Sequence, residues 1–521
     1  MDVLSLAGPA LESLFKRLLI MVLVSGLVCE IYNLCHPVLQ SAVARYPSID
    51  QRLIKPFSSF SSSFTQMIRD FRHGVYYKPF GRQEPVIIRS PDALEELSEA
   101  SELSQRAVYA DIFGFKYMLS HTETEWDPNE QINQRYRLFT RAIRIAGVSQ
   151  MKILQPYLQA RMKKTFQEMV YSQVTTTESW TSIQVAPVMR DLATGMLGMY
   201  FFGEKLCQEP IFASAMSRYY DNTVTCMGAM QILPAILQPF AHSMITSKGH
   251  ALKILFERLS QAADSKQDGW REDETLKSVP GISSHGSAQL LIRFESLVIQ
   301  AIIGTWFAAS HQPWINLHFV FLELCARPEY TDMIHNEIQD LENLDYESIN
   351  SLPILDSFIK ESQRDFLNIL TVGIRRKALR PFKFSNGGPH VPVGKIACVS
   401  AWEIMHNEAK YPLADTFDGL RFIKAKDKTE SGSAGTSLRG TKFTDASKDF
   451  PIWGLGSKVC PGRYHSALVI KMALVHLIAE YEFRLQDEPT SYRWFWETFQ
   501  MPYESSKVLI RKRQQEKDMT A

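Results

Sequence analysis

The stretch over residues 449–485 constrains the fold of this chain more than any other. It contains a glycine-punctuated loop that ends in a single cysteine, Cys460. A long apolar run at helical spacing follows over residues 467–478, so the sequence predicts a sharp turn that leads into a buried helix. Pro461 fits the first turn of this helix, where its missing N–H costs no hydrogen bond. A thiolate at Cys460 would then face helix N–H groups, which lower the pKa of a thiol.

Two interpretations of Cys460 compete. An isolated cysteine is most often a small buried residue of the core. A lone thiolate on a glycine-rich loop is also a known axial ligand of haem iron. The spacing favours the haem ligand, because an aromatic residue, two glycines and a basic residue precede the cysteine and another glycine follows it. These residues are Trp453, Gly454, Gly456, Lys458, Cys460 and Gly462.

This pattern resembles the cysteine-ligand loop of the cytochrome P450 superfamily, usually written Phe-Gly-X-Gly-X-Arg-X-Cys-X-Gly. Trp453 stands for the usual Phe and Lys458 for the usual Arg, so both positions keep their chemical type. The resemblance implies a mainly α-helical fold with a small β-region around haem b. Cys460 would be the axial thiolate, and the other residues of the loop would contact the haem.

The resemblance also implies the organisation of the chain. We expect an N-terminal membrane anchor over residues 1–36 and one haem-thiolate catalytic domain over residues 37–521. Electrons would come from a separate NADPH–cytochrome P450 reductase, with cytochrome b5 as an additional donor, because no flavin domain follows the predicted haem helix.

Composition argues against several other classes of protein. The chain has 57 basic and 56 acidic residues, so it lacks the basic excess that a nucleic-acid-binding protein needs. Its 7 cysteines are odd in number and show no paired spacing, which indicates a reducing compartment instead of a disulfide framework. The sequence contains no Cys-X-X-Cys pair or Cys/His cluster that would indicate zinc.

The N-terminal segment Leu18–Cys29 is uncharged and mostly apolar. It is shorter than the about 20 residues that a membrane-spanning helix needs, and an extension to Cys35 includes Glu30. A signal-anchor helix, a cleaved signal peptide and an interfacial amphipathic helix are the three alternatives. A cleaved signal fits least well, because no disulfide-rich domain follows. The family resemblance favours an anchor in the endoplasmic reticulum membrane, with the catalytic domain in the cytosol.

The remaining segments predict a helix-rich chain. A strand over residues 85–89 is followed at once by a helix, and residues 150–260 form helices whose Met and aromatic stripes pack in the core. The polar stretch Ser265–Gly286 predicts a surface loop, and a long helix follows over Ala288–Arg327. The low-complexity stretch Lys424–Lys448 predicts an exposed insertion.

The segment Gln131–Ala146 predicts a helix on which basic and apolar residues alternate. A solvated face is the ordinary reason for such a pattern. In the P450 superfamily, however, a helix at this place carries an aromatic residue or His, then three residues, then an Arg that binds a haem propionate. Gln131 and Arg135 have this spacing, so the resemblance makes Arg135 the expected propionate ligand and Arg137 the alternative.

The long predicted helix contains a run from Ala308 to Pro313 that resembles the oxygen-activating helix of P450 enzymes. Fungal members often read Ala-Ala-X-His-Thr-Thr there. His311 fits this form, but Gln312 stands at the alcohol position. Gln312 can donate and accept hydrogen bonds but has no hydroxyl to relay a proton, and Pro313 should kink the helix. The resemblance makes Ala308, His311 and Gln312 candidate catalytic residues.

The missing hydroxyl leaves three alternatives. A water chain bound by His311 and Gln312 replaces the relay, or the substrate supplies a hydroxyl group. In the third alternative, the product forms without net insertion of oxygen, as in desaturation, radical coupling, rearrangement or ring expansion of a tetramate to a 2-pyridone. A histidine buried in the core with its hydrogen bonds satisfied is the ordinary interpretation of His311.

Glu361 and Arg364 lie three residues apart on a predicted helix and therefore on one face, where they can pair. Their surroundings, Lys-Glu-Ser-Gln-Arg, resemble the family's Glu-X-X-Arg motif. Downstream, the segment Phe417–Phe422 resembles the one whose arginine, here Arg421, completes a buried triad. This triad is expected to be structural.

Between these motifs, the segments Gly373–Leu379 and Val391–Val399 resemble the strand pair that lies beside the haem in this family. Arg376 is the expected partner of a haem propionate, and Arg375 is the alternative. These assignments follow from the resemblance and not from the spacing.

The amino-acid sequences of these motifs resemble those of family members from the specialised metabolism of filamentous fungi. We therefore predict a monooxygenase that oxidises a hydrophobic intermediate, such as a terpenoid, a polyketide or a polyketide–peptide hybrid, with O2 and electrons from the reductase. The alternatives are an enzyme with the non-hydroxylating chemistry described above, one that rearranges its substrate without external electrons, and a non-catalytic haem-binding protein.

Overall fold

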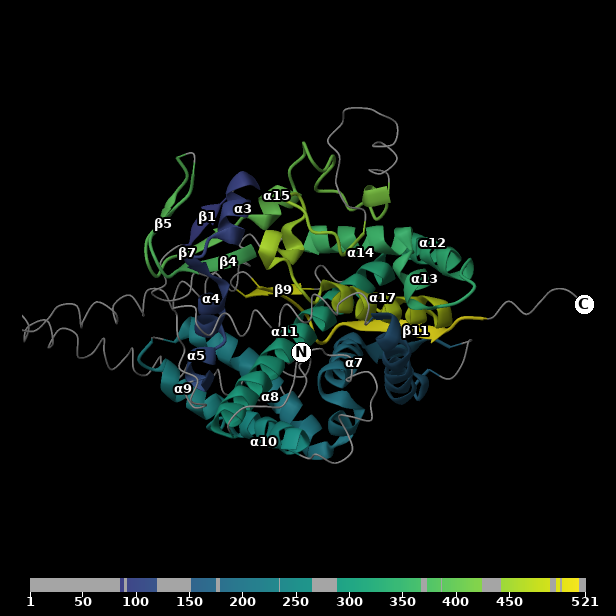
Figure 1. Cartoon of the computed structure of the whole chain (residues 1–521). Coiled ribbons are helices and arrows are strands. Elements are labelled where there is room, and N and C mark those ends of the chain that lie inside the picture. The colour runs from purple at the N-terminus through teal and green to yellow at the C-terminus, as the bar shows by residue number, and fades with distance from the viewer. Residues whose placement is uncertain are drawn as a thin grey trace, which may run out of the picture.

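The computed structural model describes residues 85–88, 91–119, 151–174, 179–233, 235–264, 288–366, 373–385, 387–423, 442–487, 493–496 and 499–514. Over these residues the chain is mainly helical with small sheets, as the sequence predicts (Figure 1). The predicted N-terminal anchor, the helix with Arg135 and Arg137, the loop over residues 265–286 and residues 424–441 of the predicted insertion lie outside them. At the end of that insertion Phe443 and Thr444 are buried, so the prediction that it is exposed is wrong there. Within this part of the chain, none of the helices combines the length and the apolar character of a bilayer span.

Helices make up most of the described residues. They are α3 (Pro91–Glu99), α4 (Gln105–Ile112), α5 (Phe115–Leu119), residues 151–166 with a π-helical end (Gln167–Tyr171), α7 (Val185–Gln208), α8 (Pro210–Ile232), α9 (Gln238–Ile245), α10 (His250–Asp264), α11 (Ala288–Ala326), α12 (Pro328–Gln339), α13 (Tyr346–Asn350), α14 (Pro353–Phe366), α15 (Ala401–Met405) and α17 (Arg463–Glu480).

The strands are short and form small sheets. They are β1 (Val86–Ile88), β2 (Leu103–Ser104), β3 (Thr181–Gln184), β4 (Gly373–Ala378), β5 (Phe382–Lys383), β6 (His390–Val391), β7 (Ile396–Val399), β8 (Tyr481–Leu485), β9 (Arg493–Trp496), β10 (Phe499–Pro502) and β11 (Lys507–Lys512). The largest sheet has the order β1-β7-β4-β2, with β1 parallel to β7 and the other pairs antiparallel. The predicted strand at residues 85–89 and the predicted β4/β7 pair are thereby confirmed.

Helix α11 passes through the middle of the helical part and packs against α7, α10, α14 and α17 (Figure 1). It ends at Ala326, one residue before the predicted end, because Pro328 starts α12. It continues as one helix through Pro313.

Helix α17 is buried on nearly all sides, which explains why its sequence is an apolar run and not an amphipathic stripe.

The prediction that Pro461 lies in the first helical turn is wrong. Helix α17 starts at Arg463 with Gly462 as its N-cap, so Pro461 lies in the turn before the helix. The N–H of Cys460 donates to the carbonyl of Trp453 at 2.7 Å, and this bond keeps Cys460 in the loop. The helical hydrogen bonds therefore begin only afterwards, where the N–H of Ser466 donates to the carbonyl of Gly462.

Two hydrophobic cores meet at the cysteine loop. The main core lies among the long helices, and a smaller one lies between α3 and the β1-β7-β4-β2 sheet. Trp453 belongs to the main core and Leu455 to the smaller one, although only Gly454 separates them. The sheet and α3 lie at the upper left of Figure 1, with α8, α9 and α10 at the bottom. The loop thus joins the two parts of the fold.

Candidate functional site

The cysteine loop has a closed backbone conformation that depends on its glycines. Gly454 and Gly456 have φ angles of 77° and 56°, values that side chains other than glycine rarely adopt. A Cβ atom at Gly454 would lie 3.0 Å from the carbonyl oxygen of Lys458. Together with the bond from Cys460 to Trp453, these conformations give the loop one defined shape.

Helix α3 contacts the loop through Glu99, a residue that the sequence analysis missed. The Glu99 carboxylate accepts hydrogen bonds from the N–H and the hydroxyl of Ser457, at 2.6 and 2.7 Å. A Cβ atom at Gly456 would lie only 2.1 Å from the same carboxylate. Gly456 is therefore required both for its φ angle and for the close approach of α3.

Trp453 is buried where the family pattern has Phe. Its indole N–H donates to the carbonyl of Phe443 at 2.7 Å, which satisfies the polar atom that Phe lacks. Cys460 itself is partly buried and packs against the main core. Lys458 is exposed, and Gly462 has a φ of −89° that any residue can adopt. The backbone conformation therefore requires glycine at positions 454 and 456, whereas the conformation at position 462 is open to other residues.

One face of α11 borders an open space, although the helix lies in the middle of the fold. Gly304, Ala308 and Gln312 are exposed and lie four residues apart, on one face of the helix. A Cβ atom at Gly304 would meet no atom within 4 Å. The residues between them, such as Phe307 and Ser310, are buried. Ala308 and Gln312 are therefore accessible to a small molecule, and Gly304 joins them as a residue that the sequence analysis missed.

His311 lies on a different face from Gln312. It is buried, its ring is stacked on Phe307 with 5.7 Å between the ring centroids, and its Nδ1 lies 2.6 Å from the hydroxyl of Tyr220. Burial, with a smaller contribution from the charge of Arg190, lowers the pKa of His311 to about 4, so the ring is neutral near pH 7. The hydroxyl of Ser310 donates to the carbonyl of Trp306, inside the helix.

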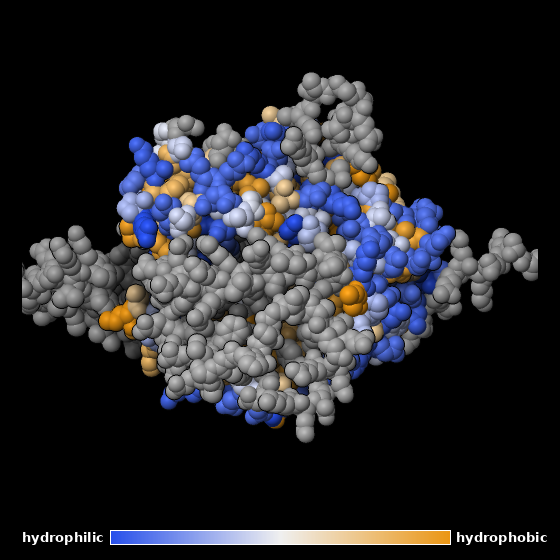
Figure 2. All heavy atoms as spheres, in the orientation of Figure 1, coloured by the Kyte–Doolittle hydropathy of each residue, from blue (hydrophilic) through white to orange (hydrophobic). Residues whose placement is uncertain are grey.

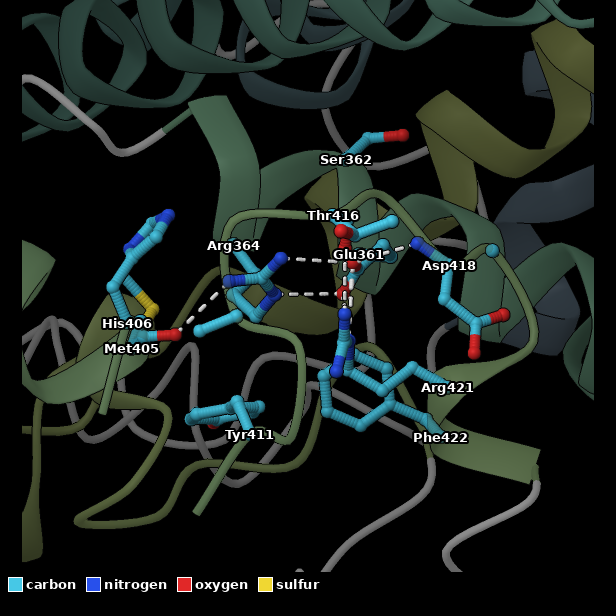
Figure 3. A network of polar contacts seen from close by, with 12 residues as sticks. Glu361, Ser362, Arg364, Met405, His406, Tyr411, Thr416, Asp418, Arg421 and Phe422 are labelled. Carbon is cyan, nitrogen blue, oxygen red and sulfur yellow. Dashed lines mark hydrogen bonds and ion pairs between the residues drawn. The ribbon is translucent and has the colours of Figure 1, made fainter. Parts of the chain in front are cut away.

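Glu361 and Arg364 form the buried ion pair that their spacing predicts. Arg364 Nε and Nη2 donate to the two carboxylate oxygens at 2.8 and 2.9 Å, and both side chains are fully buried (Figure 3). Burial alone would lower the pKa of Arg364, but the hydrogen bonds and charge of Glu361 outweigh it and raise that pKa. The third guanidinium nitrogen donates to the carbonyl of Met405 at 3.1 Å.

Arg421 completes the triad. Its Nε donates to both oxygens of Glu361, at 3.1 and 3.0 Å, and the N–H of Asp418 donates to the same carboxylate at 3.0 Å (Figure 3). Its other nitrogens donate to backbone carbonyls in residues 412–416. The triad thus joins α14, the end of α15 at Met405 and the segment over residues 412–421 in one network.

A second buried ion pair, which the sequence analysis missed, joins α14 to α17. Lys471 Nζ lies 2.7 Å from Asp356 Oδ1, and both side chains are nearly fully buried. Asp356 also accepts a hydrogen bond from the N–H of Phe443. The single lysine in the apolar run of residues 467–478 was the available signal, because a buried lysine needs an acidic partner. Helix α14 therefore holds the segments on both sides of the cysteine loop.

Arg376 is a buried cation on β4. Its Nη1 donates to the backbone carbonyl of Arg375 at 3.1 Å, and the described residues provide no ion pair for it. Burial lowers the pKa of Arg376 to about 10. A buried guanidinium requires a negative group or several acceptors, so this position suits a bound carboxylate. Arg375 is buried beside it, and Arg135 lies outside the described residues.

The surface on the face shown in Figure 2 is mostly hydrophilic where it is described, and hydrophobic residues reach it only in small groups. No group of three or more His, Cys, Asp or Glu side chains that suits a metal ion occurs among the described residues. The features that carry candidate functional residues are the cysteine loop, the open face of α11 and Arg376 on β4.

The chain is similar to a known protein family and to several curated proteins. The family model described as "Cytochrome P450" matches residues 56–509. The cytochrome P450 monooxygenase pyr9 of Aspergillus fumigatus is 25% identical over 317 residues, which are 60% of each chain. The cytochrome P450 monooxygenase ltmQ of Epichloe festucae var. lolii is 25% identical over 350 residues, 65% of this chain and 63% of ltmQ. The matched stretch thus spans less than two thirds of either relative.

Solved structures share the fold. The retinoic-acid-bound cyanobacterial CYP120A1 has a TM-score of 0.58 and 16% identity, over 82% of this chain and 89% of that one. The haem domain of cytochrome P450DA has a TM-score of 0.60 and 15% identity, over 87% of this chain and 92% of that one.

Proposed function

The chain belongs to the cytochrome P450 family, an oxidoreductase family, and on this premise we propose that it is a haem-thiolate monooxygenase of fungal secondary metabolism. The observation that carries the proposal is the cysteine loop. Cys460 lies in a closed turn between two cores, held by α3 on one side and by α14 on the other. Such support is what an axial ligand needs to keep one geometry.

The residues present suit haem b as the cofactor. Cys460 would provide the thiolate ligand, and buried Arg376 would provide the positive charge for a propionate, with Arg135 predicted for the other one. When bound, the haem iron supplies the activation of O2, and the thiolate ligand favours cleavage of the O–O bond. Gly304 and Ala308 carry almost no side chain, so the open face of α11 leaves room for a substrate.

Gln312 is the residue of the open face that can hold a water molecule or a substrate group by its amide. The hydroxyl of Ser310 donates inside the helix and is buried, so it does not replace the alcohol that the family pattern has at position 312. This observation favours a second candidate function. In that case the same site completes a desaturation, a rearrangement or a ring expansion, such as that of a tetramate to a 2-pyridone, instead of a hydroxylation.

The proposed substrate is a hydrophobic intermediate of the terpenoid, polyketide or polyketide–peptide type. The aromatic cluster of Phe113, Phe115 and Phe307 supports an apolar substrate, with ring centroids 5.4 to 6.0 Å apart where α4, α5 and α11 meet. The curated relatives are fungal monooxygenases, which supports a role in secondary metabolism. A separate NADPH–cytochrome P450 reductase, with cytochrome b5 as an additional donor, is the proposed source of electrons.

We further propose attachment to the endoplasmic reticulum membrane, with the catalytic domain in the cytosol. The segment around α9 supports this location, because four large apolar side chains are exposed within nine residues: Ile236, Leu237, Phe240 and Met244. Between Asp221 and Glu257 the sequence contains no acidic residue. An exposed apolar group without negative charge suits contact with a lipid surface.

The test is a mass comparison. The gene is deleted in its host, and the metabolite that accumulates is compared with the normal product by high-resolution mass spectrometry. A product with one added oxygen supports hydroxylation or epoxidation, and a product that has lost two hydrogens supports the second candidate function. A host carrying Cys460→Ser should accumulate the same metabolite as the deletion. An unchanged metabolite profile in both strains would contradict both functions and favour a non-catalytic haem-binding protein.

A further inference from the structure

A buried hydrogen-bonded group joins α8 to α11 at His311, the residue before Gln312 in the chain. Tyr220 of α8 lies at its centre. Its hydroxyl is 2.6 Å from Nδ1 of His311, and the indole N–H of Trp314 donates to the same hydroxyl oxygen. All three side chains are buried. The sequence separates Tyr220 from the two α11 residues by more than 90 positions, so this group is visible only in the fold.

The donor and acceptor chemistry of the group determines where its protons lie. The indole of Trp314 can only donate, so the Tyr220 oxygen is its acceptor. The hydroxyl proton of Tyr220 then needs an acceptor of its own, and Nδ1 of His311 is the one that the described residues provide. If Nδ1 carried a proton, the Tyr220 hydroxyl would be a buried donor without an acceptor, which is costly.

The charge state of His311 completes the assignment. Burial keeps the pKa of His311 near 4, and the positive charge of Arg190 acts in the same direction. The ring is therefore neutral near pH 7 and carries one proton. Since Nδ1 accepts from Tyr220, that proton is on Nε2. This nitrogen makes no hydrogen bond to a described residue, so its N–H is the donor of the three side chains that is left for another acceptor.

A partly exposed ion pair lies next to Trp314. The guanidinium of Arg190 on α7 lies over the Trp314 ring, 4.8 Å from its centroid. Arg190 Nη2 is 2.5 Å from Glu504 Oε1, with both side chains about 30% exposed. Trp314 is thus held between Tyr220 and a cation, and this fixes the direction of its N–H.

We propose that Tyr220 is a positioning residue that keeps His311 in one tautomer, with Nδ1 as acceptor and Nε2–H as hydrogen-bond donor. His311 then offers its Nε2–H as a donor to a water or to a carbonyl oxygen of the substrate. The proposal rests on the proposed function only for the role of that donor. The tautomer itself follows from the contacts and is testable without turnover.

The first experiment measures the tautomer in the purified full-length holoprotein. The protein is labelled with [15N]histidine, and solid-state NMR separates protonated from unprotonated ring nitrogens. The His311 signals are assigned by their loss in His311→Asn. We expect an unprotonated Nδ1 in the wild type and a mixture of tautomers in Tyr220→Phe. A protonated Nδ1 in the wild type, or the same single tautomer in both proteins, would overturn the proposal.

Tyr219→Phe is the matched control. Tyr219 is the neighbouring buried tyrosine of α8, and its ring lies near Trp306 and Phe307 instead of His311. The change removes the same hydroxyl from the same helix. It should leave the His311 signals as they are in the wild type, and a change equal to that of Tyr220→Phe would mean that the helix and not the hydrogen bond determines the tautomer.

The second experiment tests the role of the donor in the enzyme reconstituted with its reductase. The amide of Gln places an N–H donor near the position of Nε2, whereas Asn places its polar atoms near Nδ1. We expect His311→Asn to form roughly threefold to tenfold less product per NADPH oxidised, the effect of one lost hydrogen bond, and His311→Gln to retain most of it. Equal losses in the two variants, or a larger loss in His311→Gln, would overturn the proposal.

These outcomes separate the proposal from the proposed function. If the wild type consumes no substrate in the presence of NADPH and reductase, the proposed function fails, but the tautomer measurement still decides the contact between Tyr220 and His311. If the wild type turns over and Tyr220→Phe yields as much product per NADPH as Tyr219→Phe, the positioning role fails and the proposed function stands.

Discussion

The strongest prediction concerns Glu361, the carboxylate that two buried arginines share. The change is Glu361→Gln, which keeps the size of the side chain and removes its charge. Arg364 and Arg421 together donate to both of its oxygens, and the side chains of this triad are at most 8% exposed. The variant therefore leaves two guanidinium groups buried without a counter-charge.

The magnitude follows from this burial. Removal of one partner of a buried ion pair costs about 3–5 kcal/mol, whereas loss of an exposed pair costs about 0–1 kcal/mol. With an unfolding entropy of about 2.1 cal/mol/K per residue, a chain of 521 residues loses roughly 1 °C of Tm per kcal/mol. We therefore expect Glu361→Gln to lower the Tm by about 3–5 °C.

The assay is thermal unfolding of the purified protein at neutral pH, followed by circular dichroism. The matched control is Glu347→Gln, because Glu347 pairs with Lys152 at the surface, where both side chains are 60% exposed. The control should shift the Tm by less than about 1 °C. If the two variants unfold at the same temperature, the argument that burial makes the triad structural is wrong.

Three further predictions use the same unfolding assay. Gly456→Ala should lower the free energy of unfolding by about 1–3 kcal/mol from the positive φ alone, in addition to the effect of the clash with Glu99. Adding Glu99→Ala should remove the clash and restore only that part of the stability. If the double variant were as stable as the Glu99→Ala protein, the φ angle would carry no strain. Asp356→Ala should lower the free energy of unfolding by about 3–5 kcal/mol, because Lys471 stays buried without a partner. Adding Lys471→Met should restore most of this stability. If the losses of the two single variants added up in the double variant, this pairing would be contradicted. Burial lowers the pKa of His318 to about 3, so between about pH 6.5 and pH 3 the unfolded chain binds a proton that the folded chain does not. Stability should therefore fall as the pH falls through this window, and His318→Leu should show a smaller fall; an equal slope in both proteins would refute the shift.

Some features of the site were predictable because they are local in the chain. The pairing of Glu361 with Arg364 needs only three residues of helix, and the structure contains it. The buried helix after Cys460 follows from an uninterrupted apolar run, and α17 is such a helix. The error at Pro461 is also informative. The spacing allowed a helix to start there, but the bond from Cys460 to the carbonyl of Trp453 delays it.

Other features were not predictable because they join distant parts of the chain. Glu99 contacts Ser457 across 358 positions, and no local pattern marks either residue as a partner of the other. The same is true of Tyr220 and His311. The propionate role of Arg376 stays a prediction from the family resemblance, to which the structure adds the burial of its charge.

Local patterns in the chain were enough to predict a mainly helical fold, the glycine loop before Cys460 and the absence of a hydroxyl at position 312. They were enough because helix periodicity, glycine conformations and side-chain chemistry are properties of short segments. The contacts of neighbouring residues on one helix could be read only from the fold. Gln312 borders the open space and His311 turns to Tyr220, since successive residues of a helix point about 100° apart and the packing of α8 against α11 selects what each direction meets.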